Sequence, residues 1–286
     1  MRRRDAYHWR IFATGLCFTL FGVGGLVLGL CWFPVLRLLP GSAQTHRLRV
    51  LKTLRVALNL FVRVMRGVGV LSFRFEGVER LGRPGQVIVA NHPSLIDVVF
   101  LIAFVPDACC VVKQALWRNP FTRGPVTAAG YVSNTPTDVM IQSASEALHA
   151  RQSVIIFPEG TRTTPGQSLQ FHRGAATIAI RAAAVVTPVF ISCRPTTLSK
   201  GRPWYRIPYK RARFTLRVGD DIELTPFREA SPAPIAARAL NKYLLEIFEA
   251  ELAAERRAET METAADASAG GRGTRRIDDA DQRSNI

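Results

Sequence analysis

A histidine and an aspartate lie five positions apart in residues 91–97, which read Asn-His-Pro-Ser-Leu-Ile-Asp. If the chain turns into a helix between them, the Asp97 carboxylate can accept the imidazole Nδ1–H of His92. That bond would fix the tautomer, leave Nε2 as a general base and stabilise the imidazolium that forms. The alternative interpretation is a histidine that caps a helix, with Asp97 exposed to solvent.

A second segment with chemical potential is residues 157–163, Phe-Pro-Glu-Gly-Thr-Arg-Thr. Gly160 lets the backbone approach a ligand closely. Arg162 offers a planar fork that suits a phosphate or a carboxylate. Glu159 can orient an acceptor hydroxyl or hold Arg162 in place. The alternative is an edge turn with a surface ion pair, which would contribute little to stability.

Each segment follows a short apolar run that is typical of a buried strand, residues 87–90 and 153–157. Further strands are predicted at 108–112, 185–192, and 214–218 with 221–224. Helices are predicted at 91–103, 143–151, 174–184 and 232–255. This alternation predicts an α/β fold with a mixed sheet flanked by helices. Ligands of open α/β sheets bind at the carboxyl ends of strands, where both segments would lie.

The order Asn-His-Pro-Ser-x-x-Asp, then Phe-Pro-Glu-Gly-Thr-Arg, then Val-x-Pro-Val resembles the glycerolipid acyltransferase family, in particular the bacterial 1-acyl-glycerol-3-phosphate acyltransferases. The resemblance covers roughly residues 70 to 225. It implies direct transfer of an acyl chain from a thioester to a hydroxyl that His92 deprotonates, with Asp97 orienting His92. It further implies no metal, no cofactor besides the thioester, and no acyl-enzyme. The implied substrate-binding residues are Glu159, Gly160, Thr161, Arg162, Lys113 and Pro188.

Lys113 begins a stretch that resembles the family's second block, and here the sequence departs from the pattern. The family usually closes that block with an acidic residue and an Arg that helps to bind the acceptor phosphate, whereas residues 133–136 are Ser-Asn-Thr-Pro. Lys113 or Arg118 can replace the lost Arg, or both are solvated charges. The expected acceptor is a lysophospholipid such as 1-acyl-glycerol-3-phosphate. A lyso-ornithine lipid or an aryl-polyene-type lipid is the alternative.

An uncharged stretch of 26 residues lies between Arg10 and Arg37. As a helix it would reach about 39 Å, longer than a hydrocarbon core of about 30 Å. It is too long for a signal peptide and is predicted to be a membrane anchor. Two forms stay open, one tilted span or a re-entrant hairpin bent at its glycines. Basic residues on both flanks favour the cytoplasmic side of the cell (inner) membrane for the catalytic domain. Residues 56–73 are predicted to form an amphipathic helix on the membrane or on the domain.

The formal net charge of the 286 residues is +16, and residues 1–75 hold twelve Lys and Arg against one acid, Asp5. A basic block beside an apolar stretch indicates an anionic bilayer as partner. Residues 200–217 add seven basic residues interleaved with Trp204, Tyr205 and Tyr209. This composition suits the headgroup level of a bilayer, RNA stacking, or a solvated loop. No nucleic-acid-binding signature accompanies the charge, so nucleic acid is not expected.

The predicted organisation is an anchor with the amphipathic helix at 1–74, an acyltransferase domain at 75–257 and a disordered tail at 258–286. The basic surface suits either acyl-CoA or acyl carrier protein as donor, because both are acidic. Five cysteines at odd spacing fit neither a disulfide framework nor a zinc site. Two other classes of function stay open. A lipid hydrolase would need a nucleophile, and Ser94 is the candidate. A catalytically inactive membrane scaffold would not need His92, Asp97, Glu159 and Arg162 together.

Overall fold

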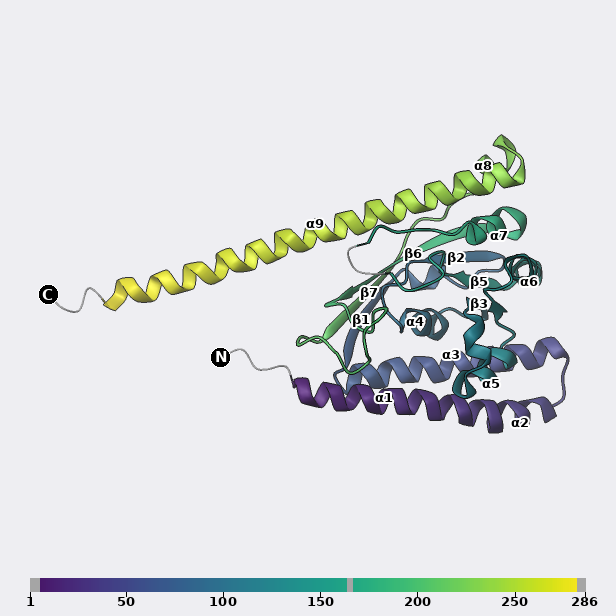
Figure 1. Cartoon of the computed structure of the whole chain (residues 1–286), viewed down its shortest axis with the longest axis horizontal. Helices are drawn as coiled ribbons and strands as arrows, with labels where there is room; N and C mark the ends of the chain where they lie inside the picture. Colours follow the sequence, from purple (N-terminus) through teal and green to yellow (C-terminus); the bar gives the residue numbers. More distant parts are fainter. Residues whose placement is uncertain (1–5, 164–166, 282–286) are drawn as a thin grey trace. The chain divides into compact units, whose positions relative to one another are not determined.

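A seven-stranded sheet forms the centre of the protein in a computed structural model that describes residues 6–163 and 167–281 (Figure 1). The strand order is β1-β7-β6-β2-β5-β3-β4. All neighbouring strands are parallel except β6 and β7. The strands are β1 (Leu71–Glu76), β2 (Gln86–Ala90), β3 (Ala108–Val112), β4 (Val132–Ser133), β5 (Ser153–Ile156), β6 (Val185–Arg194) and β7 (Ala212–Val218). The predicted mixed sheet flanked by helices is confirmed.

Helices cover both faces of this sheet because its central strands are apolar on both sides. Every residue of β2 and β5 is buried, as parallel strands in the middle of a sheet require. Ile88 and Ala90 share a core cluster with Phe100 of α4 (Asp97–Phe104). The flanking helices are α3 (Ala43–Gly67), α5 (Pro120–Ala128), α6 (Thr137–His149), α7 (Gly174–Ala182) and α8 (Thr225–Ala230). Short 3₁₀ turns lie at Val78–Arg80 and Gln114–Trp117.

The N-terminal apolar segment is helical from Tyr7 to Leu38 without a reversal, so the re-entrant hairpin is not formed. It consists of α1 (Tyr7–Val27), a π-helical turn (Leu28–Trp32) and α2 (Phe33–Leu38). Gly25 and Gly29 in this helix allow close packing against α5. A Cβ on Gly29 would lie only 2.9 Å from the Cα of Gly124 in α5.

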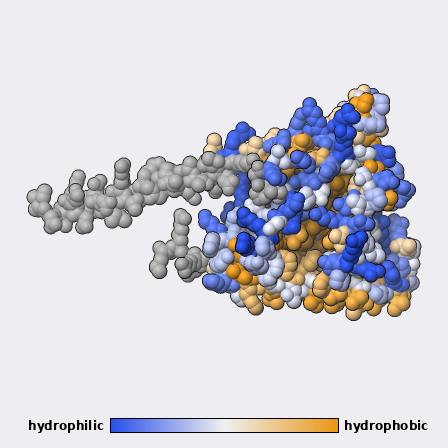
Figure 2. All heavy atoms as spheres, viewed as in Figure 1, coloured by the Kyte–Doolittle hydropathy of each residue, from blue (hydrophilic) through white to orange (hydrophobic). Residues whose placement is uncertain are grey.

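α1 and α2 pack against α3, and the chain reverses between the two in residues 39–42, where Ser42 caps α3. The ring centroids of Phe21 and Phe61 are 5.6 Å apart, and Trp9 donates to the Val68 carbonyl at 2.9 Å. The outer side of the layer formed by α1, α2 and α3 is apolar and exposed (Figure 2). Its large exposed side chains are Phe12, Leu16, Leu20, Val23, Val27, Leu30, Val35, Leu38, Val56 and Leu60.

Two sequence predictions differ from the structure. The amphipathic helix predicted at 56–73 is instead the second half of α3, a turn at 68–70 and the start of β1. Gly69 has φ +82°, a left-handed conformation that glycine adopts without strain and that ends the helix. The last helix, α9 (Ala233–Asp281), continues into the stretch predicted to be disordered. Alanine, glutamate and arginine there have high helix propensity.

The chain forms two compact units, residues 1–242 and 243–286. The helices of the predicted anchor, residues 1–74, share a core cluster with the sheet, so Cys17, Phe33 and Leu54 are buried with Phe100 and Phe214. No unit boundary therefore falls at residue 74 or residue 257.

Candidate active site

His92 and Asp97 form a hydrogen-bonded pair at the carboxyl end of β2. β2 ends at Ala90, and α4 begins at Asp97, so the intervening residues 91–96 make the turn that the spacing requires. His92 Nδ1 lies 2.9 Å from Asp97 Oδ2. The imidazole is mostly buried but keeps 16% of its side-chain surface exposed, whereas the Asp97 side chain is fully buried. The predicted contact between the two side chains is thus formed, and the role of His92 as the base stays a prediction.

The surroundings of Asp97 fix its orientation. The Ser94 backbone N–H donates to Asp97 Oδ2 at 2.6 Å, so one oxygen accepts from both Ser94 and His92. Burial raises the pKa of Asp97 above its usual value, and the hydrogen bond to His92 opposes that rise. The carboxylate therefore depends on its donors to stay ionised.

The 157–163 segment holds His92 from the opposite side. Glu159 Oε1 accepts from the His92 backbone N–H at 2.9 Å, and the Thr163 N–H donates to the His92 carbonyl at 2.7 Å. The ring of Phe157 stacks on the imidazole with centroids 4.4 Å apart. Three contacts thus join the two motifs, because β5 lies beside β2 in the sheet.

Glu159 bonds to the backbone of His92 and to the Thr163 hydroxyl, at 3.0 Å, and forms no ion pair with Arg162 in the described part of the chain. Burial raises the pKa of Glu159, against the pull of these two donors. Of the two predicted uses of Glu159, holding Arg162 is therefore not what the structure shows. Its observed contacts position His92.

Arg162 donates from Nη1 to the carbonyls of Leu198, at 2.7 Å, and Ser199, at 3.2 Å. One guanidinium nitrogen is thus bound to backbone, and the other two can donate to a ligand. Gly160 has φ +63° and closes the turn by donating to the Phe157 carbonyl. A Cβ there would meet the ring of His172 at 3.3 Å. Thr161 is half-buried in the same turn.

Lys113 lies exposed directly after β3, at the same edge of the sheet as His92. β3 is two strands away from β2, so their ends are about 10 Å apart at about 4.8 Å per strand. Asn134, one of the residues 133–136 that depart from the resembling family's pattern, accepts from the Gln114 N–H at 3.2 Å. Arg118 is exposed and directly follows the 3₁₀ turn Gln114–Trp117.

Pro188 is not among the residues that surround His92. It pairs with Val89 inside the sheet, and its carbonyl accepts from Gly219. The side chain of Thr187 bonds to Gln86 and Asp221, at the end of the strands opposite His92. In this structure the segment therefore supports the sheet, and a substrate role for Pro188 stays a prediction.

Sequence reasoning missed the structural roles of two residues that shape the site. Asn91 is buried and its amide forms two 2.8 Å bonds with the backbone of Ile191 in β6. Ser94 is fully buried and its hydroxyl donates to the Thr197 carbonyl at 3.0 Å. The signal for Asn91 was available, since a polar side chain that ends a buried strand needs a partner.

Within residues 6–163 and 167–281, no group of three or more His, Cys, Asp and Glu side chains could hold a metal ion. A cavity of about 590 Å³ lies at the β4 edge, lined by residues that include Arg47, Trp117, Tyr131 and Glu146, and it does not include His92.

Comparison with known proteins gives a family match that covers both motifs. Residues 72–192 match the family model described as Acyltransferase, a range that contains both motifs. These residues are an acyltransferase-family domain. The chain is 30% identical over 189 residues to the human protein 1-acyl-sn-glycerol-3-phosphate acyltransferase beta, covering 62% of this chain and 61% of that one. It is 28% identical over 182 residues to a protein of Pseudomonas aeruginosa named 1-acyl-sn-glycerol-3-phosphate acyltransferase, covering 62% and 69%.

A likeness of fold extends beyond those residues. The crystal structure of the Thermotoga maritima 1-acyl-sn-glycerophosphate (LPA) acyltransferase PlsC superposes with a TM-score of 0.65 over 87% of this chain and 97% of that one, at 23% identity. The chain spans about three fifths of the length of the human relative.

Proposed function

We propose that this protein transfers a fatty acyl chain from the thioester of acyl-CoA or acyl carrier protein to the hydroxyl of 1-acyl-glycerol-3-phosphate. The observation that carries the proposal is the His92–Asp97 pair, held from both sides by the Ser94 turn and the Glu159 segment. The names of the human and Pseudomonas aeruginosa relatives support the choice of reaction and acceptor.

The chemistry proceeds in one transfer without a covalent enzyme intermediate. His92 Nε2 removes the proton of the acceptor hydroxyl as its oxygen attacks the thioester carbonyl. The C–S bond of the tetrahedral intermediate then breaks, and the imidazolium returns its proton to the departing thiolate. Asp97 stabilises the imidazolium between the two steps. The thioester is the only co-substrate, and no cofactor takes part.

The acceptor phosphate is bound by Arg162 and Lys113 in this proposal. Arg162 has two guanidinium nitrogens beyond the one that contacts Leu198 and Ser199. Lys113 adds a flexible charge whose backbone lies about 10 Å along the sheet edge, and its four-carbon stem can reach back toward a phosphate held near His92.

A phosphate-free acceptor is the second candidate, and one observation favours it. The stretch 133–136 lacks the Arg that the resembling family has there, and its Asn134 side chain is bonded to the Gln114 backbone, so a phosphate would have fewer cationic donors here. A lyso-ornithine lipid or an aryl-polyene-type lipid would fit this loss.

A hydrolytic reaction is disfavoured by the position of Ser94. Its hydroxyl is fully buried and donates to the Thr197 carbonyl, so it does not present a nucleophile to His92.

The proposal includes contact with a bilayer, which the apolar outer side of α1, α2 and α3 supports. Because α1 and α2 pack lengthwise on α3 and α5, we propose that they lie along the membrane surface rather than cross it. Basic residues on both flanks of the apolar segment favour the cytoplasmic side of the inner membrane.

The experiment that tests the function offers 1-acyl-glycerol-3-phosphate, a lyso-ornithine lipid and an aryl-polyene-type acceptor side by side to the purified full-length protein with an acyl thioester. We expect 1-acyl-glycerol-3-phosphate to be the best acceptor. Transfer only to a phosphate-free acceptor would replace the main proposal with the second, and no transfer to any acceptor would contradict both.

The role of Glu159 gives a separate expected result. Glu159→Gln keeps an oxygen that can accept from the His92 N–H, so we expect kcat to stay within about tenfold of wild type and KM for the acceptor to stay unchanged. If the Glu159 carboxylate instead bound the acceptor hydroxyl, replacing it with glutamine would raise KM for the acceptor. Steady-state kinetics on both variants, with Glu159→Ala as the comparison that removes the acceptor atom, decides between them.

Glu159→Gln should also change how stability depends on pH. Because burial raises the folded-state pKa of Glu159, the folded protein holds that proton more tightly than the unfolded chain, and stability falls as pH rises through the window above the ordinary Glu pKa of 4.5. The glutamine variant lacks this part of the fall. Chemical denaturation of both proteins across that window measures it.

A further inference from the structure

The loop between β6 and β7 contains a basic and aromatic stretch, residues 200–211, here called the strap. It contains no acidic residue. Lys200, Arg202, Arg206 and Lys210 are exposed, and so are Trp204, Tyr205 and Tyr209. Tyr209 is 79% exposed, which is unusual for an aromatic side chain in a folded domain.

The strap packs on the amino-terminal half of α1, the helix with the apolar outer side (Figure 1). The rings of Tyr209 and Tyr7 stack with centroids 4.8 Å apart. Trp204 lies 5.8 Å from Phe18, and its ring covers Gly15 so closely that a Cβ there would meet it at 3.2 Å. The exposed aromatic and basic side chains of the strap therefore flank the proposed bilayer-contacting helix.

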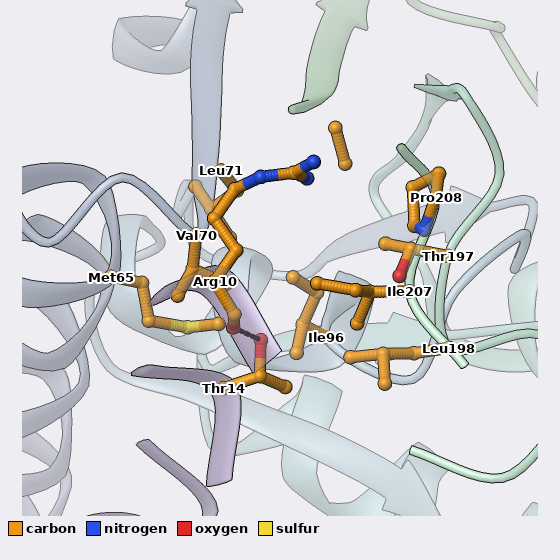
Figure 3. Close-up of a pocket in the computed structure, with 11 residues that line it drawn as sticks. Arg10, Thr14, Met65, Val70, Leu71, Ile96, Thr197, Leu198, Ile207 and Pro208 are labelled. Atoms are coloured by element: carbon orange, nitrogen blue, oxygen red, sulfur yellow. Dashed lines mark hydrogen bonds between the residues drawn. The ribbon is translucent and has the colours of Figure 1, made fainter. Parts of the chain in front are cut away.

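Beneath the strap lies a cavity of about 20 Å³, about the volume of one water probe (Figure 3). Ile207 and Pro208 line it from the strap, Arg10 and Thr14 from α1, and Ile96 from the turn before Asp97. Arg10 is almost fully buried and donates to the Tyr209 carbonyl. Two residues further along the strap, Arg211 donates to the carbonyls of Arg66 and Leu71. The carboxyl-terminal end of the strap is thus held, and the charged side chains in its middle are exposed.

The strap continues directly from a turn that contacts both catalytic motifs, residues 197–199. Three donors bind carbonyls of this turn. They are the Ser94 hydroxyl, the Leu95 N–H at 3.3 Å, and Arg162 Nη1. A shift of the strap would therefore move the carbonyls that hold Arg162, the residue proposed to bind the acceptor phosphate.

We infer that the strap binds the headgroups of anionic phospholipids and that this contact holds residues 197–199 against Arg162, so that acceptor binding depends on anionic lipid. The second part rests on the proposed function, whereas the first does not. Basic side chains beside exposed Trp and Tyr are the combination that the headgroup level of an anionic bilayer binds. The strap residues act as positioning residues through Arg162 and do not touch the reacting atoms.

Vesicle sedimentation tests the binding without any need for activity. The full-length protein is mixed with phosphatidylcholine vesicles with and without phosphatidylglycerol, and compared with the triple variant R202Q, R206Q, K210Q. Each basic residue near an anionic surface strengthens binding roughly fivefold, so the variant should partition about 100-fold less onto the anionic vesicles. Its binding to pure phosphatidylcholine should be unchanged.

Two matched controls separate the strap from general charge. R151Q, R181Q, R238Q removes the same number of exposed charges elsewhere and should bind anionic vesicles far better than the strap variant. R202K, R206K keeps the charge and should bind as wild type. Equal loss in both glutamine variants, or displacement of wild-type protein from anionic vesicles by RNA at equal charge, would overturn the inference.

The link to Arg162 is tested by kinetics with a short-chain, water-soluble lysophosphatidic acid. For wild type, adding phosphatidylglycerol vesicles should lower KM for this acceptor, with kcat changed less than KM. The R202Q, R206Q, K210Q variant should keep the kcat of wild type, but its KM should no longer respond to the vesicles. The R202K, R206K variant should retain the response of KM. If the KM of the wild-type protein does not respond to vesicles, the link between the strap and Arg162 is overturned. Acyl transfer in the same assay would still support the proposed function.

Discussion

Replacing His92 with alanine should lower kcat by about 10²–10⁴-fold, the usual contribution of a general base. Because Nδ1 of His92 is bonded to Asp97, Nε2 is the ring nitrogen that can take the proton of the acceptor hydroxyl. The fold should survive, because the imidazole is partly exposed and its main packing contact is one ring, that of Phe157.

The control for this substitution is His149→Ala, which removes an exposed histidine at the end of α6. It should retain wild-type turnover. Thermal unfolding of the three proteins checks that they are folded. An alanine variant at His92 that is folded and retains turnover within a few-fold would remove His92 as the base.

Replacing Asp97 with asparagine should lower kcat by about 10²–10⁴-fold as well, because the neutral amide cannot stabilise the imidazolium and can present its NH₂ to Nδ1, which favours the wrong tautomer. The side chain keeps its volume in a fully buried site. Turnover near wild type would mean that the pair is structural.

The Asp97→Asn variant should lose activity without losing stability. Burial raises the folded-state pKa of Asp97, so stability of the wild-type protein falls as pH rises through the window above the ordinary Asp pKa of 3.8. Asparagine has no charge to bury and should unfold at an equal or higher temperature at neutral pH. A large drop in melting temperature together with lost activity would show that the fold had failed instead.

Much of the sheet was predictable because its strands are short apolar runs beside turn signals. The strand at Ala108–Val112 has the predicted bounds, and β2 and β5 differ from prediction by one residue. The segment 56–73 was misassigned because its apolar spacing was read through Gly67 and Gly69. A Gly-x-Gly after a helical pattern is a stop signal, and the left-handed φ of Gly69 is its physical basis.

The site was predictable where its partners are close in sequence. His92 and Asp97 are five residues apart, and a turn between strand and helix is enough to join them. The partners of Arg162 are carbonyls 36 and 37 residues away, and backbone acceptors leave no trace in residue identity. The bond from His92 N–H to Glu159 spans 67 residues and depends on β2 and β5 being neighbours, a property of topology.

The most direct test of acyl transfer by His92 and Asp97 is to follow a labelled acyl chain from its thioester in the presence of 1-acyl-glycerol-3-phosphate. The account predicts that the label moves to the acceptor hydroxyl, that the H92A variant leaves it on the thioester, and that intact-mass spectrometry finds no acylated protein. Label recovered as free fatty acid, or attached to the protein, would contradict direct transfer.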